Sequence, residues 1–88
     1  MSYLVQLCVR YKDGVLNPEA SAIQEGTQQL GFGIEQLVWG RYCSYVSSQP
    51  TKKDAEKEAR DLCETLFANP VMETYQVLSV KRMLKKKG

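Results

Sequence analysis

The sequence predicts an α+β domain, a β-α-β-α-β sandwich with a three-stranded sheet and two helices on one face. Three observations support this class: strand-like and helix-like hydrophobic periods alternate along the chain, Pro, Gly and Asn separate them, and no internal repeat interrupts the order. The length of 88 residues is enough for one hydrophobic core. We therefore expect one domain over residues 1–83 and a basic, disordered tail over residues 84–88.

The first strand and the first helix have clear signals. In Tyr3–Tyr11 the side chains alternate with the two-residue period of a strand. A helix is expected from Pro18 to about Leu30, because Asn17 can cap free backbone amides and proline fits the first helical position. Gly31 is expected to end this helix in the left-handed conformation. The inward stripe of the helix is expected to comprise Ala22, Ile23, Gly26 and Leu30.

The second strand is expected over Leu37–Ser48, which is rich in aromatic and β-branched residues. This segment is longer than a core of this size can cover. It is therefore expected to bend at Gly40 or to extend onto a partner.

The second helix has the strongest amphipathic pattern. It begins after Thr51, which forms a variant of the capping box with Asp54, and it ends at Asn69 because Pro70 follows. Its apolar face is expected to comprise Ala55, Ala59, Leu62, Cys63, Leu66 and Phe67. A third strand is expected from about Thr74 to Met83.

The predicted sheet has more apolar surface than its helices can cover. Two helices with one apolar stripe each cover one face of three strands, yet apolar and aromatic residues occur on both faces. The two outer strands also leave open edges. We therefore expect self-association to complete the fold, as a homodimer or a tetramer.

Composition excludes several classes of function. The chain has no histidine, so imidazole catalysis, Ser-His and Cys-His pairs and the commonest zinc ligands are missing. Its three cysteines have no C-x-x-C spacing and are expected to be reduced, buried thiols. We therefore expect no catalytic residue, metal site or cofactor site in this chain.

The first residues and the apolar segments indicate a cytoplasmic protein. No apolar run approaches the roughly 18 residues that a membrane span needs, and the first residues lack the pattern of a signal peptide. Five of the 12 positive charges lie in the last eight residues, whereas nucleic-acid-binding proteins usually carry cations on a folded face beside aromatic residues. We therefore expect neither a membrane nor a nucleic acid as partner.

Two segments contain candidate site residues. Gly40, Arg41 and Tyr42 place a glycine that permits close approach beside a guanidinium and a phenol, which could meet a phosphate or a partner carboxylate. A bent strand with an exposed arginine explains the same residues. The second segment, ANPVMETY at residues 68–75, is typical of a helix stop joined to a strand start. By themselves these residues indicate no active site.

These segments resemble a known family. The motifs VLNP before the first helix, LGF after it, GRY in the middle strand and above all LFANPVMETY at residues 66–75 are similar to PurS, the small subunit of phosphoribosylformylglycinamidine (FGAM) synthase. The similarity covers about Tyr3 to Val80. Three features depart from the family pattern: Asn17 in place of the usual aspartate, Ala20 in place of the usual glycine, and the basic tail.

The resemblance implies a ferredoxin-like, PurS-like fold and a non-catalytic subunit in purine biosynthesis. In this family the large subunit, PurL, uses ATP and magnesium to activate formylglycinamide ribonucleotide, and the glutaminase subunit, PurQ, supplies ammonia. PurS dimers bridge the two subunits and support ammonia transfer. The positions expected to define the family or to contact a partner are Gly40, Arg41, Tyr42, Asn69, Pro70 and Tyr75.

Two other classes of function stay open from the sequence alone. A dimeric ferredoxin-like module that senses a small ligand would use the same sheet pairing. A small nucleic-acid-binding α/β protein would use the basic tail, although the aromatic and glycine pattern of RNA-recognition strands is absent.

Overall fold

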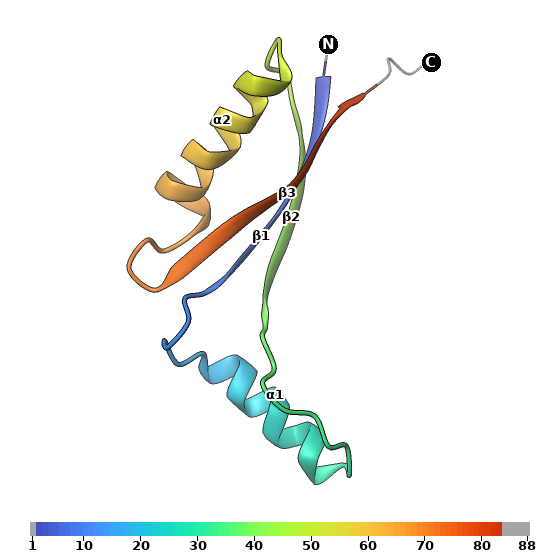
Figure 1. Ribbon diagram of the computed structural model, residues 1–88, viewed down its shortest axis with the longest axis vertical. Helices are drawn as coiled ribbons and strands as arrows, with labels where there is room; N and C mark the ends of the chain where they lie inside the picture. The colour runs from blue at the N-terminus through green and yellow to red at the C-terminus, as the bar shows by residue number, and fades with distance from the viewer. Residues whose placement is uncertain (1, 84–88) are drawn as a thin grey trace.

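The computed structural model describes residues 2–83 (Figure 1). Its elements are β1 (Ser2–Tyr11), α1 (Pro18–Gln29), β2 (Gly40–Ser47), α2 (Lys52–Leu62), the π-helical segment η1 (Cys63–Phe67) and β3 (Glu73–Met83). The α+β class and the β-α-β-α-β order are therefore confirmed. None of the helices in this range is long and apolar enough to cross a membrane. The predicted disorder of the basic tail concerns residues 84–88, which lie outside the described residues.

The sheet has the strand order β2-β1-β3, and both pairings are antiparallel. The first strand is therefore the central one, and β2 and β3 form the two edges. In this register Leu7 lies opposite Cys43 on one side and Val77 on the other. The pairing shifts between Gln6 and Leu7, where β3 contains one extra residue, Leu78.

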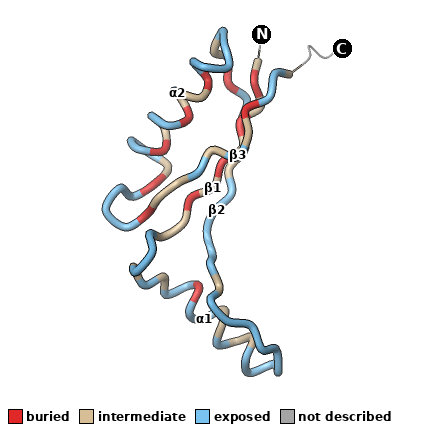
Figure 2. Tube along the Cα trace, viewed as in Figure 1, coloured by how far each residue is buried: buried red, intermediate tan, exposed pale blue. Residues whose placement is uncertain are grey.

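The core lies between one face of the sheet and α2. Burial alternates along β1, as its sequence pattern predicts, and the side chains facing the helix are Tyr3, Val5, Leu7 and Val9. The helix contributes the small residues Ala55, Ala59 and Cys63, all fully buried. Figure 2 shows these buried residues along the strands and the facing side of α2. Small residues let the helix approach the sheet closely, which keeps the larger strand side chains out of water.

The sequence predicted one helix as far as Asn69, but α2 ends at Leu62. After Leu62 the chain forms η1, which closes with a hydrogen bond from the N–H of Ala68 to the carbonyl of Cys63 at 3.0 Å. The wider turn rotates the side chains that follow. Leu66, predicted on the apolar face, is therefore 73% exposed, whereas Phe67 packs against the core.

The position of α1 differs from the prediction that both helices cover one face of the sheet. Its cap is as predicted: Asn17 Oδ1 accepts from the N–H groups of Glu19 and Ala20. However, α1 continues beyond the end of the sheet, and α2 alone lies over the face (Figure 1). The predicted inward stripe is wrong, since Leu30 is 78% exposed and Ala20 is the buried residue of the helix. Most α1 side chains are small or polar, so the helix has no apolar stripe large enough to hold it on the sheet.

The second strand is shorter than predicted, because residues 37–39 do not join the sheet. They follow α1 instead: Asn17 Nδ2 donates to the carbonyl of Trp39 at 3.0 Å, and Gln24 Oε1 accepts from the N–H of Leu37 at 3.0 Å. Strand pairing starts at Gly40, where the chain leaves the helix and enters the sheet.

The three cysteines are free thiols, as predicted. Their predicted burial holds fully only for Cys63. Cys8 in the central strand β1 and Cys43 in the edge strand β2 are half-buried. Burial raises the pKa of the Cys63 thiol, so this side chain stays protonated at neutral pH and acts as a small apolar group.

Candidate functional site

Asn69 organises the turn that joins η1 to β3. Its Oδ1 accepts a hydrogen bond from the N–H of Val71 at 2.9 Å. Its carbonyl accepts from the N–H groups of Met72 and Glu73 at 3.2 and 2.7 Å. Pro70 presets the backbone at the corner. The predicted helix stop and strand start are therefore parts of one closed turn, whose backbone groups have partners within the turn.

Glu73 is the buried centre of this end of the molecule, with a side chain that is 8% exposed. Its Oε1 accepts from the backbone N–H of Asn69 at 2.8 Å. Arg41 reaches it from β2 with both terminal nitrogens, Nη1 to Oε2 and Nη2 to Oε1, each at 2.9 Å. Nη2 also donates to the carbonyl of Phe67 at 3.1 Å. This bidentate pair joins the start of β2 to the end of η1 and the start of β3.

The pair is stabilised in its charged form. Hydrogen bonds from Arg41 and from the backbone of Asn69 lower the pKa of Glu73 below its ordinary value. The hydrogen bond to Glu73 raises the pKa of Arg41, although desolvation opposes this shift. Both groups therefore stay charged near neutral pH.

This lowered pKa predicts loss of stability in acid. Because the folded pKa of Glu73 is depressed, its contribution is fully present above the ordinary value of 4.5 and is lost as pH falls through the folded pKa. We expect Glu73→Gln to lower the free energy of unfolding at pH 7 by about 1–2 kcal/mol. The difference between this variant and the wild type should shrink as pH falls below 4.5.

Urea unfolding at a series of pH values checks this prediction. The lowered pKa of Glu58, which accepts from Gln49 and Ser47, leaves some acid sensitivity in the variant. Asp61→Asn is the matched control, because its pair with Lys57 is exposed on a helix surface and contributes only about 0.3–0.5 kcal/mol. If the free energies of unfolding of Glu73→Gln and the wild type differed by a constant amount down to pH 3, the lowered pKa of Glu73 would not be the source of the acid sensitivity.

The structure gathers most of the predicted site residues at one end of the sheet. Arg41, Asn69 and Pro70 surround Glu73, and Pro70 accepts from Lys12 Nζ at 2.8 Å through its carbonyl. Gly40 lies directly before Arg41, where a Cβ atom would overlap the carbonyl oxygen of a β1 residue.

The other two predicted residues lie apart from Glu73. Tyr75 follows it along β3 and donates from its hydroxyl to Glu64 Oε2 at 2.7 Å. Tyr42 lies on the opposite face of the sheet, where its hydroxyl accepts from Gln6 Nε2 at 2.7 Å. The six residues therefore do not form one surface. Their roles at a partner interface stay a prediction.

Sequence reasoning missed Glu73 as a site residue, although it lies within the ANPVMETY segment. It also missed Glu64 and Lys12, which bond to Tyr75 and Pro70. The opposite charges of Arg41 and Glu73 are visible in the sequence, but 32 residues separate them. Only the strand register brings them to the same end of the sheet.

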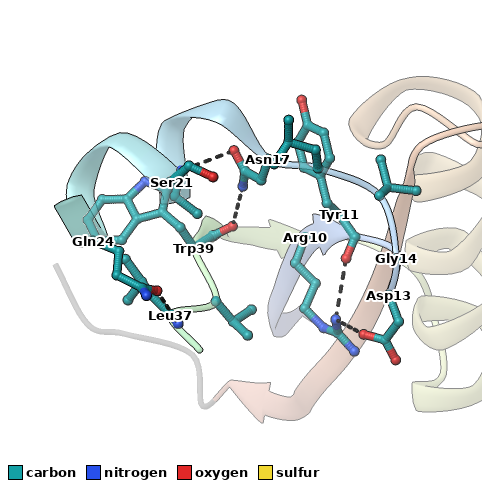
Figure 3. A pocket seen from close by; sticks show the side chains of 13 residues that line it. Arg10, Tyr11, Asp13, Gly14, Asn17, Ser21, Gln24, Leu37 and Trp39 are labelled. Atoms are coloured by element: carbon teal, nitrogen blue, oxygen red, sulfur yellow. Dashed lines mark hydrogen bonds and ion pairs between the residues drawn. The ribbon is translucent and has the colours of Figure 1, made fainter. Parts of the chain in front are cut away.

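A hollow of about 250 Å³ lies where the β1–α1 connection meets the start of α1 and residues 37–39 (Figure 3). The polar groups around it bond to one another. Arg10 donates to Asp13 at 3.3 Å, and Asn17 donates to the carbonyl of Trp39 (Figure 3). Asn17 uses both ends of its carboxamide, one as the helix cap and one for this contact. An aspartate could serve only as the cap, so this departure from the family pattern adds a bond between α1 and residue 39.

Comparison with protein families identifies the group to which this arrangement belongs. Residues 4–81 match the family model described as PurS, phosphoribosylformylglycinamidine (FGAM) synthase. The chain belongs to the PurS family. The resemblance seen in the sequence is therefore confirmed, and the match includes both the Arg41 strand and the Asn69 turn of the PurS chain.

Individual PurS proteins agree with this assignment. The PurS subunit of Methanothermobacter thermautotrophicus is 31% identical over 77 residues, which cover 88% of this chain and 92% of that relative. The solved structure of PurS from Thermus thermophilus has a TM-score of 0.84 and 28% identity, covering 96% of this chain and 100% of the other. A chain in the structure of PurLQS from Thermotoga maritima has the same fold, with a TM-score of 0.79, 24% identity and coverage of 88% and 95%.

The site of this PurS-family chain is suited to holding elements together. Its charged and polar side chains are engaged within the chain, through the Arg41–Glu73 pair and the Tyr75–Glu64 hydrogen bond. Among residues 2–83, no three His, Cys, Asp or Glu side chains are grouped so that they could hold a metal ion.

Proposed function

We propose that this chain is a non-catalytic subunit of a cytoplasmic FGAM synthase, which bridges the synthetase subunit PurL and the glutaminase subunit PurQ. The observation that carries the proposal is the PurS family match over residues 4–81, almost the whole chain. The relative from Thermotoga maritima supports the same assembly, because its structure is one of PurL, PurQ and PurS together.

The proposal places the chemistry on the partners. PurL would use ATP and magnesium to activate the formamide oxygen of formylglycinamide ribonucleotide, and PurQ would release ammonia that displaces the resulting phosphate. The present chain would join the two so that ammonia passes between their sites. Its Arg41–Glu73 pair and Asn69 turn support this role by fixing the end of the sheet rather than by taking part in the reaction.

We also propose that the working form is a homodimer. Within residues 2–83 no helix covers the face of the sheet opposite α2, and Tyr42 and Val46 on that face are 60% and 57% exposed. Such apolar surface on a small sheet is a site for association. Two open sheet edges, β2 and β3, add to it.

Reconstitution with the cognate PurL and PurQ tests the bridging role. We expect glutamine-dependent formation of formylglycinamidine ribonucleotide to require this chain, because the ammonia must move between two subunits. The reaction driven by added ammonium salt should need it much less, since PurL alone carries the phosphoryl chemistry. Full glutamine-dependent activity of PurL and PurQ without this chain would refute the proposal. So would an equal requirement in both reactions.

A further inference from the structure

The hollow beside the start of α1 is enclosed by three segments that lie far apart in the sequence (Figure 3). Arg10 and Asp13 come from the end of β1 and the connection after it, Ser21 and Gln24 from α1, and Trp39 from the segment before β2. Sites for small molecules are typically hollows of this kind, in which a few polar groups from different elements converge beside apolar side chains. A ligand in the hollow would therefore touch both the sheet and α1.

One side of the hollow presents a positive and a negative group next to each other. Arg10 Nη1 donates to Asp13 Oδ1 and to the carbonyl of Tyr11, both at 3.3 Å, which is longer than a typical hydrogen bond. Within residues 2–83, the Nε and Nη2 groups of Arg10 and the second carboxylate oxygen of Asp13 have no partner. The Asp13 side chain is 97% exposed, so the pair contributes little to stability and both charges are available to a ligand.

The α1 side of the hollow, which lies across from Arg10 in Figure 3, presents uncharged hydrogen-bond donors. Gln24 Oε1 accepts from the N–H of Leu37 at 3.0 Å, which leaves the NH₂ group as the free end of this carboxamide. In the part of the chain that the structure describes, neither this NH₂ group nor the hydroxyl of Ser21 has a partner. These donors suit an uncharged acceptor such as an amide carbonyl.

Size and charge restrict the ligand. A cavity of about 150 Å³ holds one benzene molecule, so a hollow of about 250 Å³ has room for roughly ten non-hydrogen atoms and is too small for a whole nucleotide. Among the described residues that line the hollow, Arg10 and Asp13 carry one charge of each sign. A ligand with a net charge of −2 would therefore lack a second cation, whereas a ligand with one positive and one negative group matches the pair.

We propose that this hollow binds a free amino acid with an uncharged polar side chain, of the size of glutamine. Arg10 binds the α-carboxylate, Asp13 binds the α-ammonium group, and the donors of Ser21 and Gln24 bind the side-chain carbonyl. The site is independent of the proposed bridging role, because every group in it belongs to this chain. A bound amino acid would connect β1 to α1, which is otherwise joined to the sheet through residues 12–17 and 30–39 (Figure 1).

Titration of the full chain with L-glutamine, followed by the NMR shifts of its backbone amides, tests this site. We expect a dissociation constant of about 1 mM, as for a ligand of roughly ten atoms in a partly open hollow, with the shifts concentrated around the hollow. Arg10→Gln should weaken binding at least about 10-fold, and Ser21→Ala about 3- to 10-fold. Arg60→Gln, the same change at an exposed position of α2, is the control and should bind like the wild type. Circular dichroism checks that all three variants are folded.

Ligand analogues test the assigned contacts in the unmodified chain. N-acetyl-L-glutamine lacks the ammonium group and L-glutaminamide lacks the carboxylate, so each should bind at least about 10-fold more weakly than L-glutamine. Inorganic phosphate is the probe for a simple anion site, and phosphate binding as tight as that of L-glutamine would overturn the proposal. So would the absence of shifts at about 20 mM L-glutamine, or equal binding of the two analogues. Because these measurements use this chain alone, such failures would leave the bridging role unaffected.

Discussion

Arg41→Glu is expected to lower the free energy of unfolding by about 3 kcal/mol, which corresponds to a fall in melting temperature of roughly 15 °C. The substitution removes both hydrogen bonds to Glu73 and the one to the carbonyl of Phe67. It also leaves the Glu73 carboxylate buried with the backbone N–H of Asn69 as its remaining donor among these contacts. Breaking one side of a buried pair costs more than the pair contributes, because the other charge stays desolvated.

A double-mutant cycle separates the pair from other effects of the substitution. In a Glu73→Gln background, Arg41→Glu should cost at least about 1 kcal/mol less than in the wild type, because no buried carboxylate is left without its partner. Arg41→Lys is the matched control: it keeps the charge but loses the bidentate geometry, and it should fall between the wild type and Arg41→Glu. Thermal and urea unfolding measure all four variants. Equal costs of Arg41→Glu in both backgrounds would show that the pair does not stabilise the fold.

These measurements decide how loss of activity in Arg41→Glu should be interpreted. From the sequence, this residue was a candidate for contact with a phosphate or a partner carboxylate. In the structure its guanidinium meets a carboxylate of its own chain. Its side chain is nevertheless 58% exposed, so part of the guanidinium remains accessible. If Arg41→Glu is inactive in the complex and also unfolds at the predicted lower temperature, the loss of activity is explained by the weakened fold. Only a variant that is inactive but as stable as the wild type would indicate that Arg41 contacts a partner.

The parts of the fold that local sequence determines were predictable. The alternation in Tyr3–Tyr11 identified the buried face of β1, because successive strand residues point to opposite faces. Asn17 and Thr51 cap their helices as their side-chain chemistry requires. Gly31 has a φ of +94°, the left-handed conformation expected at a helix end.

The parts that depend on distant residues were not predictable. The few apolar residues of α1 do not identify the surface on which the helix packs, and in the structure α1 lies beyond the sheet of its own chain. The π-helical turn of η1 moves Leu66 outward, and no local sequence motif predicts this turn. The Arg41–Glu73 pair depends on the antiparallel register of three strands, which hydrophobic periodicity alone does not determine.

Gly40→Ala is expected to be nearly as damaging as the loss of Arg41, at about 3 kcal/mol. Strand pairing starts at this residue, opposite Arg10, and a Cβ atom there would overlap the carbonyl oxygen of Val9. The overlap is with backbone of the central strand, so relief requires β2 to move away from β1. That movement would also draw Arg41 away from Glu73, because Arg41 is the next residue along β2.

The matched control for this prediction is Gly26→Ala in α1, where a Cβ atom meets open space. There the same substitution should stabilise the protein by up to about 1 kcal/mol, because alanine loses less conformational freedom than glycine on forming a helix. Chemical unfolding of both variants, with hydrogen exchange at the Gly40–Arg10 pairing, measures the two effects. Opposite signs for the two substitutions are the expected result. A Gly40→Ala variant as stable as the wild type, with unchanged hydrogen exchange at this pairing, would contradict the prediction. It would mean that β2 can separate from β1 at its first residue without a loss of stability, so the close approach at Gly40 does not hold the Arg41–Glu73 pair in place.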